Sequence, residues 1–193
     1  MTATAEKSLT LEEFLQQPET KPASEFIDGK IIQKPMPKGR HSCLQYETCN
    51  VINQVTKNDK IAYAFPELRC SFGNRSIVPD IAVFRWQQIP FLPDGEVPDR
   101  FDLTPDWIIE ILSPEKKPNK VIGNILYCIE RGSQLGWFLD PDDRSILVFF
   151  REGQPRLLEQ NDTLPVLEGI ELNLTVEQVF SWLKMGASAD NTP

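Results

Sequence analysis

Two short apolar segments decide the fold of this 193-residue chain: residues 78–84, VPDIAVF, and residues 107–112, WIIEIL. Apolar runs of this length predict strands that are buried inside a sheet. Each segment also carries one carboxylic acid, Asp80 at the start of the first and Glu110 within the second. Burying a polar group without a partner costs about 2–7 kcal/mol even when the group is uncharged. We therefore expect each acid to have a partner in the folded protein.

If the two strands are neighbours, Asp80 and Glu110 lie side by side, raise each other's pKa and strain the fold. A divalent cation between them removes this conflict, since Mg²⁺ prefers one or two carboxylates together with waters and phosphate oxygens. The two acids are therefore candidate ligands for Mg²⁺ or Mn²⁺. The alternative is structural: an ion pair with a buried basic residue such as Arg69, because such networks also occur away from functional sites.

A third candidate element follows the Glu110 strand. Apolar spacing predicts a helix over residues 120–131, on which Lys120 and Asn124 share a polar face. A lysine beside the two acids can orient a water molecule or stabilise negative charge on phosphorus, and Asn124 is a supporting polar group. Glu25, which begins a predicted hairpin strand, is an additional candidate carboxylate. The structural alternatives are a solvated helix-entry residue for Lys120 and an edge-strand charge for Glu25.

The rest of the chain alternates helices with strands. Capping boxes at Thr10 and Thr175 predict a short helix near each end, and Asp28-Gly29 predicts a type I′ turn. Strands are expected at residues 25–27, 30–32, 61–65, 69–72, 76–84, 107–112, 136–139, 145–150 and 155–158, and long helices at 42–57 and 120–131. This order predicts an α/β fold with a mixed central sheet flanked by helices. We expect one domain over residues 1–185 and a disordered tail over residues 186–193.

Charge and hydropathy exclude several classes of protein. The chain has 20 Lys and Arg against 28 Asp and Glu, a net charge of −8, which argues against a protein that coats nucleic acid. A small basic groove is compatible with that charge. No apolar run is long enough to span a membrane, and the first ten residues lack a signal-peptide pattern, so a cytoplasmic protein is expected.

Cysteine and histidine usage disfavours two further kinds of site. The four cysteines form no CxxC pair, and His41 is the only histidine. A zinc site of the usual spacing and a Ser–His–Asp triad are therefore both unfavoured. His41 is interpreted as a helix-entry residue without an orienting partner.

Several of these segments together resemble a known family. Pro79-Asp80 followed by residues 110–114, EILSP, resembles the PD-(D/E)XK nuclease pattern. More narrowly, the chain is similar to the Uma-type restriction endonucleases of cyanobacterial type. Residues 25–29 (EFIDG), His41 before the first long helix, and residues 136–141 (GWFLDP) also match. The similarity runs from about residue 10 to residue 185.

The resemblance implies a restriction-endonuclease-like fold, Mg²⁺-dependent cleavage of phosphodiester bonds, and homodimers. Carried over by position, it makes Asp80 and Glu110 metal ligands. The superfamily pattern places a lysine two residues after the second acid, where this chain has Leu112. Many Uma-type members carry it in the following helix, where this chain has Asn124. Lys120, one turn earlier on the same face, is the expected substitute.

The leading interpretation is a Mg²⁺-dependent endonuclease that acts on DNA. The second is a non-catalytic dimeric protein that retains the nuclease fold, which Leu112, Asn124 and the acidic charge favour. A glycoside hydrolase with two carboxylates is remote, because no aromatic platform accompanies the acids. Clustering of basic residues around the acids would favour the nuclease, and the residues concerned are Lys34, Lys38, Arg40 and Lys120.

Overall fold

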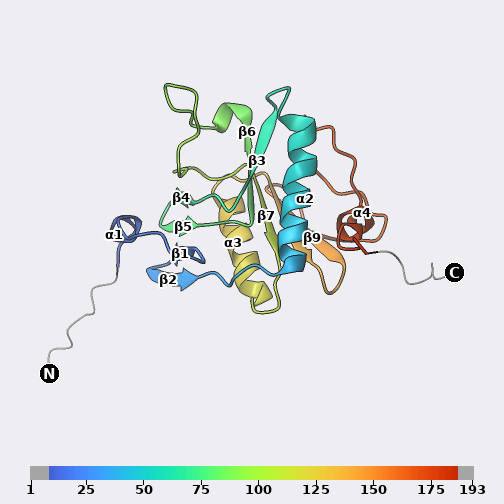
Figure 1. The fold of residues 1–193 in the computed structure, drawn as a ribbon, viewed down its shortest axis with the longest axis horizontal. Helices are drawn as coiled ribbons and strands as arrows, with labels where there is room; N and C mark the ends of the chain where they lie inside the picture. Colours follow the sequence, from blue (N-terminus) through green and yellow to red (C-terminus); the bar gives the residue numbers. More distant parts are fainter. Residues whose placement is uncertain (1–8, 187–193) are drawn as a thin grey trace.

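The computed structural model describes residues 9–186 and contains two β-sheets (Figure 1). The larger sheet has the strand order β10-β9-β8-β7-β6-β3, in which β7 and β8 run parallel and all other neighbours run antiparallel. Its strands are β3 (Ala62–Pro66), β6 (Ile81–Arg85), β7 (Trp107–Ile111), β8 (Leu135–Asp140), β9 (Ser145–Phe150) and β10 (Arg156–Glu159). Parallel neighbours need a crossover connection, and α3 (Pro118–Glu130) provides it between β7 and β8.

The two faces of the larger sheet are covered by different helices. α2 (Gly39–Thr56) and α4 (Val176–Ser181) pack on one face, and α3 packs on the other. Alternate residues of β7 show the division, since Trp107 and Ile109 belong to the core beneath α2 whereas Ile108 belongs to the core beneath α3. Side chains in a strand alternate between faces, so Glu110 lies on the α3 side of the sheet.

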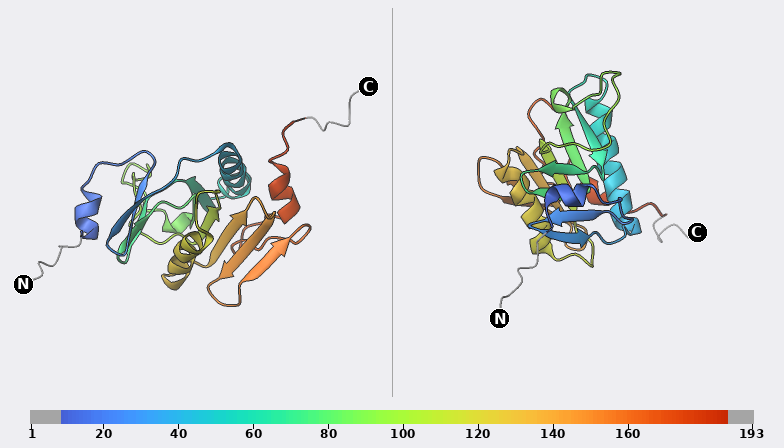
Figure 2. Two further views of the ribbon diagram at one scale, coloured as in Figure 1. Left: turned by 90° about the horizontal axis from the view of Figure 1, so that it is seen from below. Right: turned by 90° about the vertical axis from the view of Figure 1, so that its left-hand side faces the viewer.

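The smaller sheet lies beside α3 and has the strand order β2-β1-β5-β4. Its strands are β1 (Ser24–Ile27), β2 (Lys30–Gln33), β4 (Cys70–Phe72) and β5 (Arg75–Ile77). Asp28 and Gly29 have φ angles of 49° and 80°, as a type I′ turn between β1 and β2 requires. α1 (Leu11–Leu15) packs on this sheet through the rings of Phe14 and Phe26. The β1–β2 hairpin and α4 lie at opposite ends of the molecule (Figure 2).

The α/β class, the mixed sheet, the β1–β2 hairpin and both capping boxes are confirmed. One prediction is wrong: residues 76–84 do not form a single strand, because the chain leaves the smaller sheet at Ile77 and enters the larger sheet at Ile81. Pro79 has no amide hydrogen to give to a ladder, so it favours such a break. The break places Asp80 at the junction of the two sheets.

Within residues 9–186 no helix is long and apolar enough to cross a membrane. The tail predicted over residues 186–193 falls, apart from Gly186, outside the described residues. The single-domain boundary at residue 185 stays a prediction.

Candidate active site

Asp80 and Glu110 meet where β6 and β7 pair. Ile81 lies opposite Ile109 in this antiparallel ladder, so Asp80, one residue before β6, lies opposite Glu110. The backbone N–H of Ile111 donates to Asp80 Oδ2 over 2.8 Å, which fixes the carboxylate at the end of the ladder. Both side chains are buried, with residue exposures of 0% for Asp80 and 2% for Glu110. The structure thus places Asp80 directly before β6 and Glu110 opposite it within the neighbouring strand β7.

The carboxylate of Asp80 is surrounded by basic groups. Its Oδ1 lies 2.8 Å from Lys34 Nζ and 3.5 Å from Lys116 Nζ, and its Oδ2 lies 3.0 Å from His41 Nε2. Burial alone would raise the pKa of Asp80, but Lys34, His41 and Lys116 together hold it well below its usual value. Asp80 is therefore an ionised carboxylate that the fold stabilises.

The pKa of Glu110 shifts the other way. Burial and the negative charge of Asp80 raise it well above its usual value, although Lys116 and Lys34 act against them. Lys116 Nζ lies 3.8 Å from Glu110 Oε2. The expectation that each acid raises the pKa of the other is therefore wrong for Asp80, because Lys34, His41 and Lys116 outweigh the effect of burial and lower its pKa.

Asp80 has an ion-pair partner, but it is not Arg69. The guanidinium of Arg69 binds the carboxylate of Glu19 instead, at 2.7 and 2.5 Å. Lys34, which follows β2 directly, takes the place that the sequence suggested for Arg69.

Glu25 faces the two acids from the smaller sheet. It lies in β1, between β2 and β5, with 7% exposure, so it is not an edge-strand charge. Its Oε1 accepts a hydrogen bond from the backbone N–H of Val78 over 2.9 Å. Burial raises the pKa of Glu25, although Lys34 and the Val78 hydrogen bond act against this shift.

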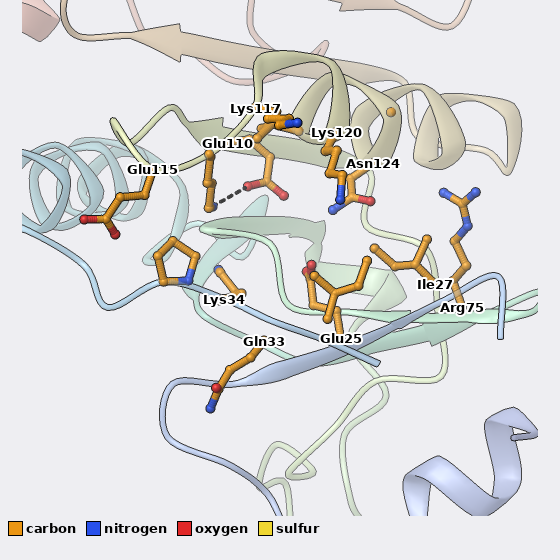
Figure 3. Close-up of a pocket in the computed structure, with 15 residues that line it drawn as sticks. Glu25, Ile27, Gln33, Lys34, Arg75, Glu110, Glu115, Lys117, Lys120 and Asn124 are labelled. Atoms are coloured by element: carbon orange, nitrogen blue, oxygen red, sulfur yellow. Dashed lines mark ion pairs between the residues drawn. The ribbon is translucent and has the colours of Figure 1, made fainter. Parts of the chain in front are cut away.

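A cavity of about 460 Å³ opens between the β1–β2 hairpin and the start of α3. Figure 3 shows Glu110, Lys120 and Asn124 on the α3 side, opposite Glu25 and Lys34 on the hairpin side. Five basic residues line it (Lys34, Arg75, Lys116, Lys117 and Lys120), against three acidic ones (Glu25, Glu110 and Glu115). The cavity is therefore basic, although the chain as a whole has a net charge of −8.

A family model described as "Putative restriction endonuclease", Uma2, matches residues 11–177. The chain belongs to the Uma2 family. It is also similar to a solved structure described as "a putative nuclease belonging to DUF820" from Anabaena variabilis ATCC 29413. The two chains are 49% identical with a TM-score of 0.88, over 91% of this chain and 99% of the other. A comparison with curated proteins gave no match. The resemblance and the fold class inferred from the sequence are thereby confirmed.

Sequence reasoning placed Lys120 and Asn124 in this Uma2 site, and both line the cavity. The structure adds Lys116, in the loop before α3, which lies within 4 Å of both acids. Within residues 9–186 Lys120 forms no ion pair with Asp80 or Glu110. The family pattern points to a lysine two residues after the second acid or in the following helix, and Lys116 lies in the loop between these two places, so the sequence did not indicate it.

Lys34 and His41 were also missed. Lys34 follows a hairpin strand and His41 sits in the first turn of α2, so each is far in sequence from Asp80. The match of His41 to the family was the one available signal. Of the other basic residues expected at the site, Lys38 pairs with Glu115 at 2.5 Å and Arg40 pairs with Asp142 at 2.6 Å. Of the four, Lys34 and Lys120 therefore lie at the site, whereas Lys38 and Arg40 pair with other acids.

The donor set suits a hard divalent cation. Within the described residues no group of three or more His, Cys, Asp or Glu side chains is arranged to hold a metal ion. A cation here would be bound by the carboxylates of Asp80 and Glu110, with waters and substrate oxygens completing the shell, which is the usual habit of Mg²⁺. The ammonium of Lys34 already holds a positive charge at Asp80 Oδ1. The two carboxylates therefore fit such a cation in the kind of ligand they offer, and binding would require the Lys34 ammonium to leave Oδ1.

Proposed function

We propose that this Uma2 chain is a Mg²⁺-dependent endonuclease that hydrolyses the phosphodiester bonds of DNA. One observation carries the proposal: the buried acid Glu110 lines a basic cavity in an otherwise acidic chain, and the buried carboxylate of Asp80 lies opposite it at the end of the β6–β7 ladder. Phosphate backbones are recognised chiefly by basic side chains. Family membership supports a nuclease, and the cavity supports a polyanionic substrate.

In this proposal Asp80 and Glu110 hold the Mg²⁺ ion. When bound, the ion polarises a phosphoryl oxygen and lowers the pKa of an attacking water. Lys116 lies beside both carboxylates and is the lysine best placed to orient that water or stabilise charge on the phosphate. Asp80, Glu110 and Lys116 would then be this chain's form of the PD-(D/E)XK pattern.

Other residues of the cavity take supporting roles in the proposal. Lys120, Lys117 and Arg75 line the cavity wall and would bind the phosphates on either side of the cleaved bond. Asn124 is 8% exposed and lines the same wall, so it would donate to a substrate oxygen. Glu25 is an additional carboxylate for the metal or for its water. We also propose a cytoplasmic homodimer.

The second candidate is a non-catalytic dimeric protein that retains the nuclease fold. One observation favours it: both oxygens of Asp80 are already engaged, by Lys34 and by His41. The presence of Leu112 two residues after Glu110 points the same way. Such a protein would keep the fold and the dimer without binding a divalent cation.

Plasmid cleavage separates the two candidates. The purified chain is incubated with supercoiled plasmid and with single-stranded circular DNA, in Mg²⁺, in Mn²⁺ and in a chelator. The proposal predicts metal-dependent nicking that Glu110→Gln abolishes. Glu177→Gln, at an exposed position on α4, is the matched control and should cut like the wild type. No cleavage of either DNA with either metal, by a chain shown to be dimeric and folded, would favour the second candidate.

A further inference from the structure

The ammonium of Lys34 is held among acidic and carbonyl oxygens. Lys34 Nζ lies 2.8 Å from Asp80 Oδ1, 2.7 Å from the Val78 carbonyl oxygen and 3.3 Å from Glu67 Oε1. The side chain is only 7% exposed. Burial acts to lower the pKa of Lys34, but the charges of Asp80, Glu110 and the other nearby acids outweigh it and raise the pKa. The folded protein therefore favours the protonated, positively charged form of Lys34 at this place.

Only the side chain of Lys34 needs to move for this cation to leave Asp80. The backbone N–H of Lys34 donates to the Ala23 carbonyl over 2.9 Å, which continues the pairing of the β1–β2 hairpin. Lys34 also lines the cavity, and a lysine stem carries its charge on four rotatable carbons. A rotation of the stem can therefore carry the ammonium from Asp80 into the cavity while the hairpin stays fixed.

A metal ion and this ammonium exclude each other at Asp80 Oδ1. A Mg²⁺ ion binds about 2.0–2.1 Å from a carboxylate oxygen, and Lys34 Nζ already lies 2.8 Å from Asp80 Oδ1, the oxygen that would bind the ion. Two positive charges this close repel strongly in a buried site. The other oxygen of Asp80, Oδ2, already contacts His41 Nε2 and accepts a hydrogen bond from the Ile111 N–H. It is therefore not free to bind the metal ion in place of Oδ1.

We propose that Lys34 competes with the divalent cation for Asp80, so that the cation binds only when the Lys34 ammonium moves into the cavity. This inference rests on the proposed function, because it assumes that Asp80 is a metal ligand. It assigns Lys34 a role in setting the affinity of the site. It also couples the binding of the divalent cation to the binding of a phosphate, because the displaced ammonium adds a positive charge where the phosphate would lie. Such coupling is reciprocal, so each ligand raises the affinity of the site for the other.

The test measures Mn²⁺ binding by calorimetry and by the melting temperature, in the absence of DNA. Lys34→Met keeps the stem and removes the charge. Its affinity for Mn²⁺ should be at least about tenfold higher than that of the wild type, and its melting temperature without metal should be lower. Lys117→Met is the matched control, because it removes one positive charge from the same cavity. Its affinity for Mn²⁺ should change by less than about threefold, since an exposed charge is well screened.

Lys34→Arg separates competition from loss of packing. It keeps the positive charge and should bind Mn²⁺ as weakly as the wild type. If Lys34→Met does not fold without metal, its folding is measured again in millimolar Mn²⁺. Folding restored by Mn²⁺ supports competition between Lys34 and the metal, and a variant that stays unfolded overturns it.

The remaining outcomes distinguish the inference from the proposed function. Equal Mn²⁺ affinities for the wild type and Lys34→Met, both lost in Glu110→Gln, would overturn the competition and leave the proposed function standing. No Mn²⁺ binding by any of the variants would overturn both.

Discussion

Asp80 and Glu110 lie opposite each other across the β6–β7 ladder, yet their carboxyl pKa values shift in opposite directions. Asp80 is ionised and paired with Lys34 and His41. The ionised form of Glu110, in contrast, is destabilised by burial and by the negative charge of Asp80. The two acids therefore make different contributions to stability. A cation that joined them would benefit mainly Glu110.

Glu110→Gln is expected to stabilise the metal-free protein at neutral pH. The folded state raises the pKa of Glu110, so it binds this proton more tightly than the unfolded state does, and stability is lost as the pH rises above about 4.5. Glutamine does not titrate, so the variant does not lose this stability as the pH rises. The melting temperature of Glu110→Gln relative to the wild type should therefore be higher at pH 8 than at pH 4. A difference that does not vary with pH would contradict the predicted shift.

Asp80→Asn is expected to destabilise the metal-free protein. Asparagine leaves the buried Lys34 ammonium without its carboxylate, and breaking a buried pair in this way costs about 3–5 kcal/mol. The pKa of Asp80 is lowered, so its contribution is present at neutral pH and is lost as the pH falls below about 3.9. Urea denaturation at pH 7 measures the change.

Asp142→Asn is the control for that measurement, because Asp142 forms an exposed pair with Arg40. Removing an exposed pair should cost no more than about 1 kcal/mol. If Asp80→Asn were as stable as the wild type, the ion pair between Asp80 and Lys34 would not contribute to the stability of the folded protein.

Lys116 and Lys120 are expected to affect different kinetic parameters. Lys116 lies beside both acids, so Lys116→Ala should lower kcat by about 10²–10³. Lys120 lines the cavity wall, so Lys120→Ala should mainly raise KM for DNA. Single-turnover cleavage separates the two effects. The opposite assignment, with kcat lost in Lys120→Ala alone, would restore the role that the sequence predicted for Lys120.

DNA binding is expected to depend on salt through the cavity lysines. Each phosphate contact adds about −0.9 to the slope of log K against log[salt] for duplex DNA and about −0.7 for a single strand. Lys117→Ala combined with Lys120→Ala should therefore make the slope shallower by up to two such increments. Titrations of Glu110→Gln with labelled oligonucleotides give this slope without cleavage. An unchanged slope would place the DNA elsewhere on the molecule.

Local patterns in the sequence were enough to predict most of the fold. The capping boxes at Thr10 and Thr175, the Asp28-Gly29 turn and the apolar segment around Glu110 are all short-range signals, and each produced the expected element. The break between β5 and β6 was missed, because Val78 satisfies its N–H with Glu25, a residue 53 positions earlier in the chain.

The candidate site was predictable only in part, for a similar reason. Asp80 and Glu110 stand out because a charge inside an apolar run is conspicuous. The groups that set their pKa values, Lys34, His41 and Lys116, look like ordinary polar residues in the sequence and meet the acids only through tertiary contacts. Composition shows an acidic chain, and the fold is needed to gather five basic residues around one cavity.

Anomalous diffraction from crystals soaked in Mn²⁺ tests the central claim most directly, because it locates the metal without relying on activity. We predict one peak within about 2.5 Å of both the Asp80 and Glu110 carboxylates, with the Lys34 ammonium no longer beside Asp80. No peak at this position, with the contact between Lys34 and Asp80 intact at millimolar Mn²⁺, would contradict the account.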